Sequence, residues 1–95
     1  MAREIQVEKK DDGEYLVTVR EGGSATTHRV TLRTEDWQRL SEGRATPEEL
    51  VRHSFEFLLE REPKEAILRQ FDLPVIAKYF PEYPREIRRM LGTSR

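Results

Sequence analysis

Apolar and polar residues alternate along three stretches in the first third of the chain. In the first stretch Ile5 and Val7 are flanked by polar side chains, and in the second Tyr15, Val17 and Val19 occupy every other position. The third stretch repeats this pattern at His28, Val30 and Leu32. Alternation with a period of two and many β-branched residues is typical of half-buried antiparallel strands. We therefore predict three strands within about residues 4–33.

The segment between the first two stretches predicts a tight hairpin. Asp11-Asp12-Gly13 suits a three-residue loop in which the glycine takes the left-handed conformation. This loop would pair Lys10 with Glu14 and therefore Val7 with Val17. A slip of one residue would turn the apolar side chains to water, so the alternation specifies this register.

Gly22-Gly23 predicts the second hairpin. A two-residue turn at this point would pair Val17 with His28. A four-residue turn from Gly22 to Ala25 would shift that pairing but keep the same side chains together on one face. In both cases we expect a three-stranded antiparallel meander with one apolar face.

The hydrophobic period changes after the third stretch and becomes helical. Glu35–Ser41 is predicted to form a short helix that carries Trp37 and Leu40 one turn apart. Thr34 is a candidate N-cap for this helix. Gly43 is expected to end it, because glycine is the usual residue just past a helix C-terminus.

Thr46-Pro47-Glu48-Glu49 predicts the start of a longer helix. Threonine at the N-cap, proline at the first helical position and glutamate at the third form a capping box. The helix is expected to run to about Arg61, since Pro63 prevents its continuation. Phe57 falls partly off the predicted apolar stripe. The stripe itself consists of Leu50, Val51, Phe55, Leu58 and Leu59.

The rest of the chain is predicted to form short helices separated by prolines. They cover Pro63–Gln70, then Leu73–Phe80 with Asp72 as a candidate cap, and a last helix from Pro84 to a stop at Gly92. Each helix is expected to bury its apolar residues: Ile67, Leu68 and Phe71 in the first, Val75, Ile76, Tyr79 and Phe80 in the second, and Ile87, Met90 and Leu91 in the third.

These elements predict an α+β fold in a single domain over residues 1–95. The three-stranded antiparallel meander at about residues 4–33 is followed by one long helix and several short proline-delimited helices at about residues 35–91. A small sheet and short helices are each marginal in water on their own. We therefore expect the long helix to lie across the apolar sheet face, which leaves few apolar side chains to line a catalytic pocket.

Composition narrows the class of protein. The 95 residues are 36% hydrophobic and 37% charged, against about 45–50% apolar and about 25% charged in typical soluble domains. No apolar run is long enough for a membrane helix or a secretory signal, so we expect a cytoplasmic protein with no membrane partner. The absence of cysteine excludes disulfides and thiolate sites. The formal net charge of −1 provides no overall field for nucleic acid.

Residues suited to catalysis or metal binding are few. His28 and His53 are the two histidines, they are far apart, and no His-Glu-x-x-His spacing accompanies them. His28 is in phase with core strand positions, and His53 adjoins Ser54 on a helix, where neighbouring side chains diverge. Paired glutamates are explained by helix first turns and solvated faces. We expect no catalytic, metal or cofactor residues. An enzyme acting through either histidine is the third hypothesis, after a protein-interaction module and a nucleic-acid-binding regulator.

Two segments resemble a family of short uncharacterised bacterial proteins. The more specific one begins SFEFLLEREPKE at Ser54 and continues through Ile67-Leu68, Phe71–Pro74 and Ile76 to Tyr79–Tyr83. The other runs from Val17–Val19 into Thr26–Thr31. The resemblance covers most of the chain and implies a bacterial cytoplasmic source. It implies no activity, cofactor or catalytic residue.

Two basic surfaces are candidates for binding. On the first, the outer face of the sheet, threonines alternate with Arg20, Arg29 and Arg33, a combination suited to phosphates or an acidic partner. The stretch Thr27–Arg33 lacks proline and is also predicted to be an edge strand, free to pair with another chain. Homodimerisation through this edge is therefore one hypothesis.

The second surface is the C-terminal helix with Arg85, Arg88 and Arg89. Residues 83–95 hold four arginines against one glutamate, a net charge of +3. Ile67–Phe80 also resembles a helix-turn-helix, which would turn Lys78 toward a DNA groove. We expect a non-catalytic protein-interaction or regulatory module with an unknown protein partner. A small nucleic-acid-binding regulator is the alternative.

Overall fold

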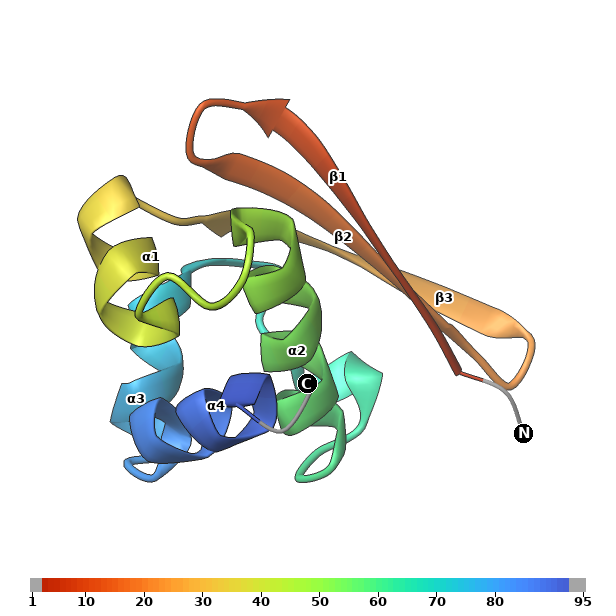
Figure 1. The fold of residues 1–95 in the computed structure, drawn as a ribbon. Coiled ribbons are helices and arrows are strands. Elements are labelled where there is room, and N and C mark those ends of the chain that lie inside the picture. The colour runs from red at the N-terminus through yellow and green to blue at the C-terminus, as the bar shows by residue number, and fades with distance from the viewer. Residues whose placement is uncertain (1–2, 93–95) are drawn as a thin grey trace.

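The computed structural model describes residues 3–92, which form an α+β fold with one four-stranded sheet and four α-helices. The strands lie in the order β1 (Arg3–Asp11), β2 (Glu14–Glu21), β3 (Ser24–Thr31) and β4 (Gln70–Asp72). The helices are α1 (Thr34–Ser41), α2 (Pro47–Leu59), α3 (Ile76–Tyr79) and α4 (Tyr83–Gly92), with the 3-10 helices η1 (Lys64–Ala66) and η2 (Leu73–Val75). All four α-helices lie on one side of the long twisted ribbon formed by β1, β2 and β3 (Figure 1).

The predicted antiparallel meander is present. Val7 pairs with Val17, as the sequence predicts, but Asp11 rather than Lys10 pairs with Glu14. The register shifts between Lys9 and Asp11, so the turn itself is shorter than the predicted loop. A bulge next to a two-residue turn keeps the apolar side chains on one face while absorbing the extra residue.

The second hairpin has the two-residue turn at Gly22-Gly23. Val17 pairs with His28 and Glu21 pairs with Ser24, so the four-residue alternative does not occur. Both glycines have positive φ angles, 64° and 81°, a conformation that side-chain-bearing residues rarely adopt. This end of the ribbon extends beyond the helices in Figure 1.

The sheet is mixed and has a fourth strand, so the predicted three-stranded sheet is wrong in this detail. The segment predicted as a helix over Pro63–Gln70 contains only the short η1. Ile67 after it has an extended backbone, and the chain bends at Ile67 and Arg69 before β4 begins at Gln70. β4 pairs in parallel with β3, with Val30 opposite Phe71. The amide of Arg29 also donates to the carbonyl of Arg69 at 2.7 Å. These bonds between distant segments stabilise an extended conformation where local patterning indicates a helix.

The long helix begins as predicted. The Thr46 hydroxyl accepts from the Glu49 amide at 3.1 Å, and the Glu49 carboxylate accepts from the Thr46 amide at 2.9 Å, completing the capping box. The helix ends at Leu59, slightly before the predicted Arg61. Phe57, predicted to lie partly off the apolar stripe, is 1% exposed. It is buried because α2 has a second apolar contact besides the sheet, with Phe80 just after α3 and with Tyr83 of α4.

The caps of the shorter helices differ from the predictions. The N-cap of α1 is Arg33 rather than Thr34, and no side chain caps it. The helix ends at Ser41, with Glu42 in the left-handed conformation ahead of Gly43. Asp72 is the N-cap residue of η2, as predicted, but its side chain makes no capping hydrogen bond. Its carboxylate instead accepts from the Thr31 hydroxyl at 2.6 Å, across the β3–β4 pair.

The core lies between the sheet and α2 and continues from α2 to α4. Phe55 faces the sheet, with its ring centroid 5.3 Å from that of His28, whereas Phe57 faces α4, with its ring 5.2 Å from that of Tyr83. The long helix therefore covers the apolar sheet face, as expected. Within residues 3–92, no helix combines the length and the apolar character needed to cross a membrane.

Candidate functional site

An apolar groove lies where the end of α2, the η1–β4 segment and α3 meet. Its volume is about 280 Å³ and one side is open to solvent. The groove is lined by Leu58, Glu62, Ala66, Ile67, Leu68, Phe71, Val75, Ile76, Tyr79 and Phe80. Apart from Glu62, every lining side chain is aliphatic or aromatic. The groove thus has the apolar lining with a single charged group that small binding sites commonly show.

The walls of the groove are fixed to the rest of the core. Phe71 packs against Phe55 of α2 with ring centroids 6.0 Å apart, and Phe80 meets Phe57 edge-on at 5.9 Å. The wall that carries Leu68 is tied to the sheet by the hydrogen bonds from His28 Nδ1 to the Leu68 carbonyl and from the Arg29 amide to the Arg69 carbonyl. A site whose walls are already ordered loses little conformational entropy when a ligand binds.

The two exposed large hydrophobic residues within residues 3–92 both belong to this groove. Leu68 is 46% exposed and Tyr79 is 65% exposed. Both were predicted to be buried, and that prediction is wrong. Each directly neighbours a better-packed apolar residue, Ile67 and Phe80 respectively, that takes the inward-facing position. Single exposed apolar residues are ordinary, but two on one apolar hollow are typical of an interaction site.

Glu62 is the charged residue of the groove. Burial raises the pKa of its carboxyl group above the usual value. The described part of the chain supplies no ion pair to Glu62, because the neighbouring cations are engaged elsewhere. Arg61 Nε lies 3.1 Å from the Glu82 carboxylate, and Lys64 Nζ lies 2.8 Å from Glu65. The groove therefore has a negative site without a counter-charge from residues 3–92.

His28 is a buried residue that joins the sheet to the groove wall. Its Nδ1 lies 2.8 Å from the Leu68 carbonyl oxygen, and its Nε2 lies 2.8 Å from the Thr26 hydroxyl. The carbonyl must accept, so Nδ1 carries the proton and Nε2 accepts from Thr26. Burial, the largest effect, lowers the pKa of His28. A hydroxyl next to a histidine resembles a catalytic pair, but His28 is 1% exposed and Thr26 is 6% exposed, so substrates cannot reach them.

The other histidine and its neighbouring serine face different ways. His53 Nδ1 pairs with the Glu56 carboxylate of the same helix at 2.9 Å. Ser54 is buried, donates to the Leu50 carbonyl at 2.7 Å and meets the Tyr83 hydroxyl at 2.6 Å. Burial raises the pKa of Tyr83, which keeps this hydroxyl protonated. The two side chains form no nucleophile–base pair.

The basic residues predicted on the sheet lie among acidic ones. Arg29 pairs with Glu14 at 3.4 Å, and Arg33 pairs with Asp72 at 3.4 Å. Arg20 has no ion pair within the described residues, but Glu4 of β1 lies directly opposite it in the register. The outer sheet face therefore carries charges of both signs rather than a basic patch.

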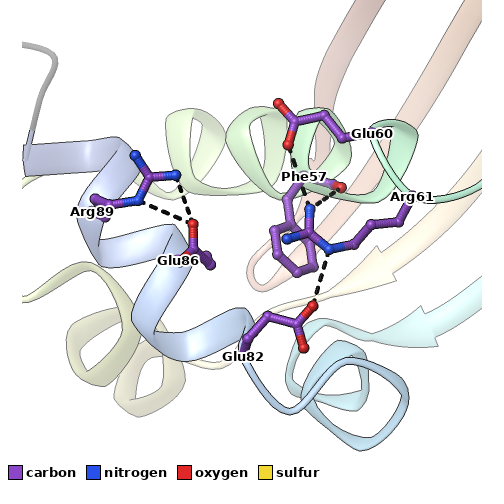
Figure 2. A network of polar contacts seen from close by, with 6 residues as sticks. All are labelled: Phe57, Glu60, Arg61, Glu82, Glu86 and Arg89. Carbon is purple, nitrogen blue, oxygen red and sulfur yellow. Dashed lines mark hydrogen bonds and ion pairs between the residues drawn. The ribbon is translucent and has the colours of Figure 1, made fainter.

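The arginines of α4 are also largely engaged. Arg89 donates to Glu86 at 3.0 and 2.6 Å, which lowers the pKa of Glu86 (Figure 2). Arg88 Nε lies 3.4 Å from the Glu42 carboxylate, and its Nη2 donates to the Arg39 carbonyl, so this side chain holds α4 against α1. Arg85 has no ion pair among residues 3–92. The structure does not bring these arginines together with those of the sheet, since the helical layer lies between them (Figure 1).

Arg61 forms a polar connection between the end of α2 and the turn before α4. Its guanidinium lies 3.7 Å from the centre of the Phe57 ring and donates to the Phe57 carbonyl at 3.1 Å. Figure 2 shows the same group reaching Glu60 and Glu82. The cation–π contact and the charged hydrogen bonds together hold one end of the helical layer in place.

Two further possibilities lose their structural basis. The first helix of the predicted helix-turn-helix is absent, because β4 occupies part of that segment. The pairing of β3 with β4 likewise covers part of the edge predicted to be free, leaving β1 as the outermost strand on the other side. Among residues 3–92, no three His, Cys, Asp or Glu side chains are grouped so that they could hold a metal ion.

Comparisons of the chain with protein-family models, with curated proteins and with solved structures found no match. The resemblance to a family of short bacterial proteins therefore stays a prediction.

Proposed function

We propose that this protein is a non-catalytic interaction module that binds another protein through the apolar groove. The observation that carries the proposal is the meeting of Leu68 and Tyr79, the exposed large hydrophobic residues of the described chain, on one hollow. Apolar anchors that fill such a hollow commonly provide most of the binding energy of an interface. The bacterial and cytoplasmic setting expected from the sequence suits such a module and is part of the proposal.

The size of the groove favours a segment of a protein over a large cofactor. Sites for drug-sized ligands and cofactors usually enclose about 300–1,000 Å³. A volume of about 280 Å³, open on one side, suits one or two apolar side chains of a partner. Because the walls are anchored to α2 and the sheet, little rearrangement is needed on binding.

The proposal is tested with peptides selected from a displayed random library against the immobilised protein. Selected peptides should bind the parent protein, and Leu68→Ser or Tyr79→Ser should weaken their affinity by about tenfold or more, as expected for a hot spot. Both variants should keep their stability to within about 0.5 kcal/mol, because these side chains are exposed. Leu16→Ser, on the outer sheet face, is the matched control. Equal binding by the parent and both groove variants would reject the proposal.

Homodimerisation through a sheet edge is a second candidate, now at β1 rather than β3. β1 is the outermost strand of the sheet. Antiparallel self-pairing centred on Val7 would bring Glu4 toward Lys10 and Arg3 toward Asp11, so that opposite charges meet. Light scattering over a concentration series is the test, and a strict monomer at high concentration would exclude it.

Nucleic-acid binding ranks below both, because most of the candidate arginines already have carboxylate partners. A binder using four or five phosphate contacts should lose affinity steeply with salt, with a slope of about −4 when the logarithm of the binding constant is plotted against the logarithm of the salt concentration. Lack of retention on duplex DNA at about 50 mM salt would remove this alternative.

A further inference from the structure

We infer that the groove selects partner segments in which a large apolar side chain has a lysine or arginine beside it, with Glu62 supplying the counter-charge. This inference rests on the proposed function and specifies the chemistry of the partner. It predicts a preference for cationic over neutral and anionic ligands of the same shape.

The position of Glu62 is the first reason. Glu62 lines an otherwise apolar hollow, and its carboxylate has no ion pair within the described part of the chain. The cations next to it in sequence, Arg61 and Lys64, are bound to Glu82 and Glu65. Burial is the one effect that shifts its pKa, and no nearby cation offsets the cost of its charge. A cation brought by the ligand would find this carboxylate without competition from the protein's own side chains.

The second reason is the aromatic rim. Tyr79 lines the same groove and is 65% exposed. Cations are attracted to the face of an aromatic ring, whereas carboxylates are repelled by it. Glu62 and Tyr79 therefore favour the same sign of charge, while Leu68, Ile67 and Phe71 provide the surface for the apolar part of the ligand.

The test uses three small probes, each with a phenyl group at the end of a four-carbon chain: 4-phenylbutylammonium, 4-phenylbutanol and 4-phenylbutyrate, whose fourth carbon is the carboxyl carbon. Each is titrated into the full chain labelled with 15N, and amide shifts are followed by NMR. All three should bind weakly, in the millimolar range expected for ligands of this size. The ammonium should bind about threefold more tightly than the alcohol and the carboxylate about threefold more weakly, as for a partly exposed ion pair. The shifts should centre on the groove, and added salt should reduce the preference.

Glu62→Gln provides the decisive comparison. It should remove the preference for the ammonium and leave the affinity for the alcohol unchanged. Glu35→Gln is the control, because this exposed carboxylate of α1 lies outside the groove lining and is not a partner of Arg61 or Lys64; the preference should persist in it. Equal affinity of the parent for all three probes would overturn the charge selection and leave the groove intact as an apolar site. Absence of groove shifts with the alcohol as well would overturn the proposed function itself.

Discussion

The buried pair of Ser54 and Tyr83 allows the packing of α2 on α4 to be tested quantitatively. Both residues are fully buried, with 0% exposure. The serine hydroxyl donates to the Leu50 carbonyl at 2.7 Å and lies 2.6 Å from the tyrosine oxygen. Because the serine proton is used by Leu50, the tyrosine hydroxyl must be the donor of the second bond. These hydroxyls form a buried polar link between α2 and α4.

The two single substitutions should have different costs. Ser54→Ala removes the acceptor and leaves the buried Tyr83 hydroxyl unsatisfied, which costs about 1–3 kcal/mol. Tyr83→Phe removes the donor while Ser54 keeps its bond to Leu50, which costs about 0.5–1.5 kcal/mol. The double variant leaves no unpaired hydroxyl, so its cost should be smaller than the sum of the two by about 1 kcal/mol.

Urea denaturation of the parent and the three variants measures this cycle. For a domain of this size, each kcal/mol should also move the melting temperature by about 4–8 °C. Single costs that add to the cost of the double variant within about 0.3 kcal/mol would refute the bond between the two hydroxyls. Leu16→Ser, far from the pair on the outer sheet face, should show additive behaviour with either variant.

Three further predictions concern the sheet and the start of α2. Burial lowers the pKa of His28 below its usual value near 6.5. The contribution of His28 to stability is therefore complete above pH 6.5 and is lost as the pH falls below it. Urea titrations at pH 7.5 and 5 should show this loss of stability, which should be smaller in His28→Gln and unchanged in His53→Gln. Gly13→Ala should destabilise the protein more than Gly22→Ala, as measured by thermal unfolding. Both glycines have positive φ, so an alanine at either position should cost about 1–2 kcal/mol of backbone strain. An added Cβ at Gly13 would also lie 3.2 Å from the Leu32 carbonyl oxygen, whereas one at Gly22 would contact nothing. Thr46→Ala should lower the free energy of unfolding by about 1 kcal/mol through loss of the capping box, and an unchanged value would show that the cap is dispensable.

The strand half of the fold was predictable because its signals are local. Alternation with a period of two specifies which side chains face the core, and glycines at the turns set the register. The pairing of Val7 with Val17 was predicted from these two features, whereas for Val17 and His28 they left a two-residue and a four-residue turn open, and the two-residue turn is present. The register shift between Lys9 and Asp11 was missed, because residues on each side of a β-bulge still alternate and the sequence pattern therefore does not reveal it.

The helical half was predicted less well because its decisive bonds join distant segments. β4 is only three residues long and pairs with β3, about forty positions earlier in the chain. A short apolar run such as the one around Phe71 fits a helix or a strand equally well when read alone. The charges of Arg29 and Arg88 were known from the sequence, but their partners Glu14 and Glu42 come from other elements.

The groove exists because of this unpredicted strand. In a helix, Ile67 and Leu68 would lie on neighbouring parts of one face and could both be buried, whereas in an extended chain adjacent side chains point to opposite sides. Ile67 has an extended backbone and His28 holds the Leu68 carbonyl, and in this arrangement Ile67 packs inward whereas Leu68 is turned toward solvent. Exposure of Leu68 is thus a consequence of hydrogen bonds in the core. A substitution that weakens the His28 bond should therefore affect binding at the groove as well as stability, although His28 itself has no access to a ligand.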